Sequence, residues 1–86
     1  MTPSMKGLRV DQSLDVRGLD GPAAYQKAVS RLKQMDDNDV LELYIHDGEA
    51  LRTIPFGLRA EGHEIVVSEP AHNGIRLLVR KRTLLP

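Results

Sequence analysis

The chain has 86 residues, no cysteine and equal numbers of acidic and basic side chains, so its formal net charge is zero. This length predicts one small domain, and the absence of cysteine excludes disulfides, thiolate metal sites and thiol catalysis by this chain. A neutral chain lacks the overall positive field that drives phosphate binding, and no apolar run approaches the roughly 18 residues of a membrane span. Because the start of the sequence also lacks the apolar core of a signal peptide, we expect a cytoplasmic location.

The N-terminal part predicts a strand that leads directly into a helix. Residues 1–7 are expected to form a flexible leader. Apolar and polar residues alternate over 8–16, as in a half-buried strand. After the turn that Gly18 permits, apolar residues recur at three- and four-residue steps over 22–35, which predicts the best helix of the chain. The acids and the amide of residues 36–39 end this helix in a polar turn.

The middle of the chain predicts a second strand and a weaker helix. Residues 40–46 carry apolar side chains on both faces, as expected for an interior strand. Asp47 suits the N-terminal cap of the helix that follows, and Gly62 suits its C-terminal cap. Pro55 and Gly57 weaken this helix, so we expect its first turn to be irregular.

The last part of the chain predicts two strands and completes the fold. Residues 64–68 are rich in β-branched side chains, and a turn over 70–74 that ends in Asn-Gly leads to a returning strand over 75–81. Residues 83–86 are expected to form a frayed tail, which leaves a single domain over 8–82. The order strand, helix, strand, helix, strand, strand predicts an α+β fold, a two-layer α/β sandwich in which both helices cover one face of a mixed four-stranded sheet.

Residues 14–24 read Leu-Asp-Val-Arg-Gly-Leu-Asp-Gly-Pro-Ala-Ala, a stretch that resembles the start of the TusA/SirA-like sulfur-carrier proteins. In that family a Leu-Asp-x-x-Gly-Leu run leads into Cys-Pro-x-Pro, and the cysteine carries sulfur as a persulfide. The run and Pro22 are present here, but Gly21 takes the place of the cysteine and Ala24 that of the second proline. The chain therefore resembles a family member that lacks the active-site cysteine. An engineered single substitution would leave the second proline in place, so the loss of both residues favours divergence.

The resemblance extends over nearly the whole chain after Val10. The Asp-x-x-Ala and Ile-Pro segments of the family recur at 47–50 and 54–55, its Gly-His pair at 62–63, and its closing Ile-Arg-Lys as Val-Arg-Lys at 79–81. These matches occur in order and at the right spacing. The resemblance thus implies the same two-layer fold.

The resemblance places the candidate binding surface at the start of the first helix. Its residues are those of the leading motif: Asp15, Arg17, Gly18, Leu19, Gly21 and Pro22. No Ser or Thr stands beside position 21 to replace the thiol, so no catalytic residue is predicted and we expect a protein that is not an enzyme. The implied function is a non-catalytic module that binds a protein partner of a sulfur-relay system, with no cofactor and with an oligomeric state that the sequence leaves open.

A second interpretation of this stretch is a domain that binds small anions. The first N–H groups of a helix have no partner within the helix, and the helix dipole is positive there. A helix start at Gly21-Pro22, with Arg17 nearby, is therefore a candidate anion pocket. The alternative is that Gly18 and Gly21 only shape the turn, and the sequence favours neither.

A third interpretation is an RNA-contacting protein, because the order of elements resembles the C-terminal domain of a bacterial translation initiation factor. The last strand would supply a basic patch formed by Arg76, Arg80, Lys81 and Arg82. Charge on an exposed strand also discourages aggregation, which is the simpler explanation. Stacking on bases needs exposed aromatic side chains, whereas Tyr25 and Phe56 are expected in or near the core, so nucleic acid is an unfavoured partner.

Histidine and carboxylate side chains are possible metal ligands, and the candidates in this chain are His46, His63, His72 and Asp47. None of their spacings matches a known ligand motif. The sequence therefore predicts no metal centre.

Overall fold

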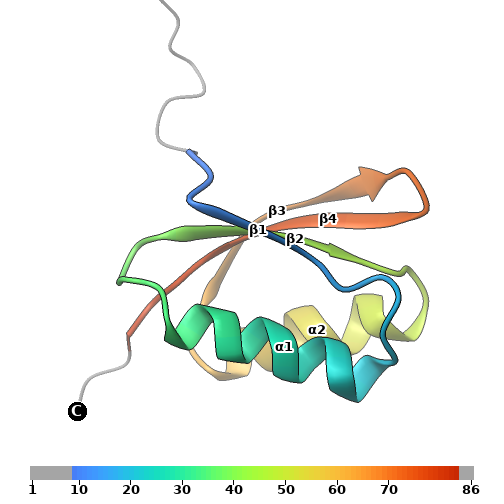
Figure 1. Ribbon diagram of the computed structural model, residues 1–86, viewed down its shortest axis with the longest axis horizontal. Helices are drawn as coiled ribbons and strands as arrows, with labels where there is room; N and C mark the ends of the chain where they lie inside the picture. Colours follow the sequence, from blue (N-terminus) through green and yellow to red (C-terminus); the bar gives the residue numbers. More distant parts are fainter. Residues whose placement is uncertain (1–8, 84–86) are drawn as a thin grey trace, which may run out of the picture.

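Alternating strands and helices build a sheet that is covered on one face only (Figure 1). The computed structural model describes residues 9–83, so the predicted leader at 1–7 and the last three residues of the predicted tail lie outside the described part. The elements, in order, are β1 (Gln12–Asp15), α1 (Gly21–Lys33), β2 (Val40–Ile45), α2 (Glu49–Ala60), β3 (Glu64–Ala71) and β4 (Gly74–Arg80). The predicted α+β sandwich with its βαβαββ order is confirmed.

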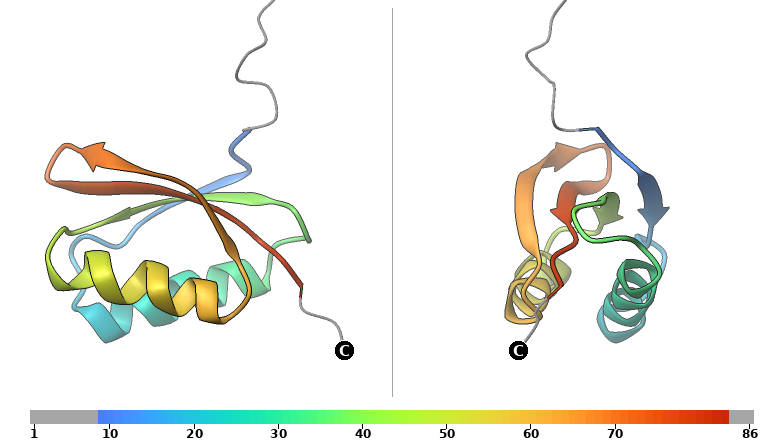
Figure 2. Two further views of the ribbon diagram at one scale, coloured as in Figure 1. Left: turned by 180° about the vertical axis from the view of Figure 1, so that it is seen from behind. Right: turned by 90° about the vertical axis from the view of Figure 1, so that its left-hand side faces the viewer.

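The four strands form one mixed sheet in the order β1-β2-β4-β3. β1 runs parallel to β2, as a strand–helix–strand unit requires, and the other two pairings are antiparallel. Both helices lie on the same face, α1 beneath the β1 side of the sheet and α2 beneath the β3 side (Figure 2). No helix of residues 9–83 lies on the opposite face of the sheet.

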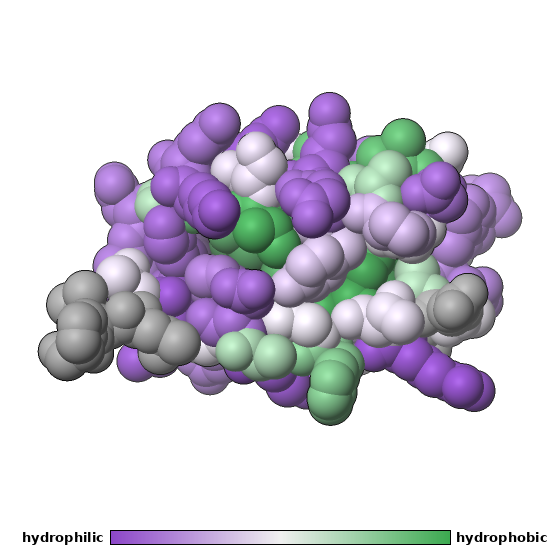
Figure 3. All heavy atoms as spheres, turned by 90° about the horizontal axis from the view of Figure 1, so that it is seen from below, coloured by the Kyte–Doolittle hydropathy of each residue, from purple (hydrophilic) through white to green (hydrophobic). Residues whose placement is uncertain are grey.

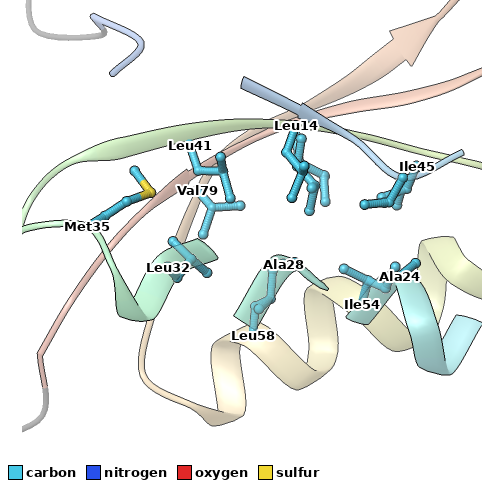
Figure 4. Packing of buried hydrophobic residues seen from close by; sticks show 13 residues of the cluster. Leu14, Ala24, Ala28, Leu32, Met35, Leu41, Ile45, Ile54, Leu58 and Val79 are labelled. Carbon is cyan, nitrogen blue, oxygen red and sulfur yellow. The ribbon is translucent and has the colours of Figure 1, made fainter. Parts of the chain in front are cut away.

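The core lies between the sheet and the two helices (Figure 4). The sheet contributes side chains that point down from its two central strands, and the helices contribute one stripe each. Ala24 and Ala28 allow α1 to approach the sheet closely, because they add little volume between the backbones. The side chains with no exposed surface include Leu32, Leu41, Leu43, Ile45, Ile54, Leu58, Leu77 and Val79.

Two strands differ from the expectation by more than one residue at a boundary. β1 begins at Gln12, which pairs with Leu41, and Asp11 still donates its N–H to the carbonyl of Val40, the first residue of β2, at 2.9 Å. Val10 precedes this contact and is 39% exposed. β3 continues to Ala71 and includes Pro70, because an edge strand tolerates a residue without an N–H. The turn between β3 and β4 is consequently only two residues long, and its Asn73 has a positive φ of 61°.

The second helix is continuous, although Pro55 lies inside it and an irregular first turn was expected. Burial of Ile54 and Leu58 against the core anchors the helix on both sides of the proline. Its end is well defined, because Gly62 has a φ of 99° and its N–H bonds to the carbonyl of Arg59, while the N–H of His63 bonds to that of Leu58. Gly62 is thus confirmed as the C-terminal cap, in a Schellman arrangement.

Gly74 lies close against the backbone of β2 and generates a first prediction. A Cβ at this position would overlap the carbonyl oxygen of Ile45, which belongs to the backbone and cannot move aside alone. We expect Gly74→Ala to lower the free energy of unfolding by about 1–3 kcal/mol in urea titrations followed by circular dichroism. Gly18→Ala is the matched control, since a Cβ there meets nothing within 4 Å. Equal stability of the two variants would contradict this account of Gly74.

Candidate functional site

The first helix begins with a side-chain cap that the sequence analysis did not single out. The Oδ1 atom of Asp20 accepts a hydrogen bond from the N–H of Ala23 at 2.9 Å, and the carbonyl of Asp20 accepts one from Ala24 at 2.8 Å. Pro22 has no N–H to donate. A carboxylate of the chain itself therefore occupies the position where the helix start favours an anion.

α1 begins at Gly21, one residue before Pro22, where the sequence analysis predicted its start. A Cβ built on Gly21 meets no atom within 4 Å, so a side chain at this position would enter open space. That space belongs to a groove of about 630 Å³ between the start of α1 and the middle of α2. The groove is lined by Asp20, Gly21, Pro22, Tyr25, Thr53 and Gly57.

Tyr25 forms the wall where α1 and α2 approach each other. A Cβ on Gly57 would lie 2.6 Å from Cε1 of the Tyr25 ring, so glycine is what allows this approach. The Tyr25 hydroxyl donates to the carbonyl of Gly57 at 3.3 Å and to Oε2 of Glu61 at 3.4 Å. Burial, with Glu61 close by, raises the pKa of Tyr25. The ring presents an apolar wall to the groove.

Arg17 turns away from the helix start and joins three parts of the sheet. Its Nε and Nη2 atoms bond to the two carboxylate oxygens of Asp15 at 2.9 and 2.6 Å, and its Nη1 donates to the carbonyl of His72 at 2.6 Å. Its guanidinium also lies 5.2 Å from the centre of the Tyr44 ring. These bonds to Arg17 hold the pKa of Asp15 at about 2. Arg17 thus links the end of β1 to β2 and to the β3–β4 turn.

The six motif residues consequently fall into two groups. Asp15, Arg17 and Gly18 line a depression together with three residues of neighbouring loops, namely His46, His72 and Asn73. Gly21 and Pro22 line the groove between the helices instead. Leu19 connects the two groups along the chain, and its side chain is 41% exposed.

Phe56 is a correction to the sequence analysis, which expected it in or near the core. Its side chain is 74% exposed on α2, next in sequence to the groove residue Gly57. The buried stripe of α2 follows Ile54 and Leu58, and position 56 lies outside that stripe. Helical spacing alone could have indicated this, because 56 is not three or four residues from either.

The predicted basic patch is divided among carboxylates. Arg76 bonds through Nε to Glu42 at 2.6 Å and through Nη1 to Glu69 at 2.8 Å, and these bonds raise the pKa of Arg76. Arg80 and Arg82 each lie 3.4 Å from the same oxygen of Glu64. The fourth member, Lys81, donates its Nζ to the carbonyl of Met35 at 2.8 Å. Most of this charge is therefore used within the fold and is not presented as a free cationic surface.

The three histidines lie in two different surroundings. Nδ1 of His63 accepts the N–H of Arg82 at 3.1 Å, and burial lowers the pKa of His63. His46 and His72 lie at the depression near Arg17. Within residues 9–83, no three His, Asp or Glu side chains are placed to hold a metal ion. Likewise, neither helix of the described chain has the length and apolar character to cross a membrane.

The contact between Arg17 and Asp15 generates a second prediction. In Arg17→Gln we expect the pKa of Asp15 to rise from about 2 toward its ordinary value of 3.8, because the charged partner of the carboxylate is lost. Titration of the side-chain carboxyl carbon by NMR measures this directly. Arg9→Gln is the control, since Arg9 pairs with Asp11 instead. A pKa of Asp15 that stays near 2 in Arg17→Gln would show that another group holds it down.

Comparisons with known proteins agree with the resemblance inferred from the motifs. The family model described as Sulfurtransferase TusA matches residues 12–81, a range that includes the helix start and Gly21. A protein of Archaeoglobus fulgidus, provisionally named a sulfur carrier protein, is 25% identical over 76 residues, which cover 87% of this chain and 86% of the relative. Because the family model spans all six elements of the fold, the chain belongs to the sulfurtransferase TusA family, as a member whose sequence contains no cysteine.

Proposed function

We propose that this protein is a TusA family member that does not carry sulfur and acts as a partner-binding module of a sulfur-relay system. The observation that carries the proposal is the position of Gly21. It is the first residue of α1 and borders the groove, in the place where the family motif has its cysteine. The framework of a carrier is present, whereas the atom that would bind sulfur is absent.

The groove offers no replacement for the missing thiol. The charge that lies beside Gly21 is the carboxylate of Asp20, which bonds to the N–H of Ala23. A negative group at this point opposes a persulfide anion and also opposes small anions from solution, because they would compete with Asp20 for the same N–H. These contacts support a binding role without group transfer, and they speak against the small-anion interpretation.

The surface next to the groove is suited to contact with another protein. Leu19 is partly exposed immediately before the cap, and Pro22 and Tyr25 give the groove a mainly apolar lining. Arg17 is not part of the proposed contact, because its donors are engaged with Asp15 and His72. A partner from the sulfur-relay system would therefore meet Leu19 and the groove, in the cytoplasmic setting that the sequence predicts.

Loading with sulfur tests the absence of transfer chemistry. A cysteine desulfurase with free cysteine is expected to leave the mass of the wild-type protein unchanged. Gly21→Cys is expected to gain the mass of one or more sulfur atoms, because it places a thiol where the family motif has its cysteine and the site has room for the side chain. Thr2→Cys, outside the motif, controls for nonspecific reaction of any thiol. A stable sulfur adduct on the wild-type chain would overturn the proposal.

Capture of the same desulfurase by immobilised protein tests the binding role. We expect Leu19→Asp to lose capture by about tenfold, since a charge would be placed in an apolar contact. Val10→Asp is the matched control, because Val10 is exposed to nearly the same extent and lies away from the groove. Equal capture by both variants and the wild type would show that this surface is not the contact.

A further inference from the structure

The neutral net charge of the chain conceals a separation of charge between its two layers. α1 contains three basic residues and no acidic one, and α2 contains two basic residues and one acidic one. The helices therefore hold a net formal charge of +4. Because the whole chain is neutral, the remaining residues hold −4.

Pairing increases this contrast. The arginines of the sheet and its connections are bonded to carboxylates, as described for Arg17 and Arg76. The exposed cations of the helices make no ion pair within the described part of the chain. They are Lys27, Lys33, Arg52 and Arg59. Among residues 9–83, these four cations without an ion pair thus lie on the two helices.

An exposed aromatic ring lies among these cations. Arg52, Phe56 and Arg59 follow one another at four- and three-residue steps, so they share one strip of α2. Phe56 is the most exposed of the large apolar residues described. Seen from the side opposite to the sheet, apolar and near-neutral side chains form a band along the middle of this face, with hydrophilic side chains around it (Figure 3). An apolar centre within a charged rim is the usual anatomy of a protein interface.

We propose that the helical face, centred on Phe56 and bordered by Arg52 and Arg59, docks an acidic protein surface that has an apolar recess for the Phe56 ring. This inference rests on the proposed function in that it describes the chemistry of the partner. Two guanidinium groups beside the ring match carboxylates around a recess. The adjacent groove, which contains Thr53 and Gly57, extends the apolar contact toward α1.

Two other occupants fit these charges less well. A second copy of the chain would bring Arg52 and Arg59 against the same residues of its partner, and like charges repel. An extended RNA would run beyond the helices onto parts of the molecule whose net charge is negative, and Phe56 alone offers an exposed ring for stacking on this strip. A compact acidic protein surface meets the cations without these costs.

Binding of peptides to the full chain, followed by NMR of its amide groups, tests the inference. The probe is a synthetic helical peptide with leucine on one face and glutamate around it. We expect it to shift the amide signals of α2 and to lose affinity as salt is added. Phe56→Gln should weaken binding by about tenfold, whereas Val10→Gln should leave it unchanged. Arg52→Gln with Arg59→Gln should weaken binding and reduce its salt dependence, whereas Arg9→Gln should do neither.

Several results would overturn the inference. The first is no binding of the glutamate peptide at low salt, and the second is equal binding of that peptide by Phe56→Gln and the wild type. The third is that a lysine version of the peptide, or a polyuridine oligonucleotide, binds as tightly as the glutamate peptide or more tightly. The desulfurase capture described above separates this inference from the proposed function. Capture that is lost in Leu19→Asp but kept in Phe56→Gln leaves the proposed function standing and removes the helical-face contact. If the peptide binds through Phe56 but the desulfurase is not captured, the helical-face contact stands and the proposed function is removed.

Discussion

The constraint on which the structure depends is that both helices of the described chain cover the same face of the sheet. Side chains such as Leu43 and Leu77 must be removed from water by two helices that lie side by side under four strands. The helices can do so only if they approach each other closely, which Gly57 allows by leaving space for the ring of Tyr25. The groove beside Gly21 is a consequence of this packing, because it lies between the start of α1 and the residues of α2 next to which Tyr25 packs.

The uncovered face of the sheet explains where the charges of the strands go. The polar residues of β2 and β4 that point away from the helices form a bonded layer, and Leu78 on the same side is only 3% exposed. Glu42 accepts hydrogen bonds from Ser13, Tyr44 and Arg76, and these bonds lower the pKa of Glu42. The arginines of the last strand stabilise this layer, while four exposed cations of the helices make no ion pair within residues 9–83.

The sequence predicts the fold well because its periodicities are strong. The alternation around Leu14 and the stripe that includes Ala28 and Leu32 identify a strand and a helix, and family motifs place the remaining elements in order. Boundaries were less predictable. The length of β1 depends on where β2 begins, and the inclusion of Pro70 in β3 depends on that strand being an edge. Neither fact can be inferred from local composition.

The candidate site was predicted only in part, for a related reason. The motif identifies Gly21 and Pro22, but the direction taken by the Arg17 side chain depends on Tyr44 and the carbonyl of His72, which are distant in sequence. Counting positive charges likewise could not show that Arg76 has two carboxylate partners. Asp20 could have been found, since an acid just before a Gly-Pro helix start is a common cap.

β4 is the last strand in the sequence, yet it occupies the middle of the sheet between β2 and β3. Until it is in place, β2 has only the four-residue parallel partner β1, and β3 has no partner at all. The sheet therefore cannot assemble progressively as the polypeptide emerges from the ribosome. Folding is delayed until the final segment, with Leu77 and Val79, has been synthesised, and loss of that segment by truncation or proteolysis would divide the sheet at its centre.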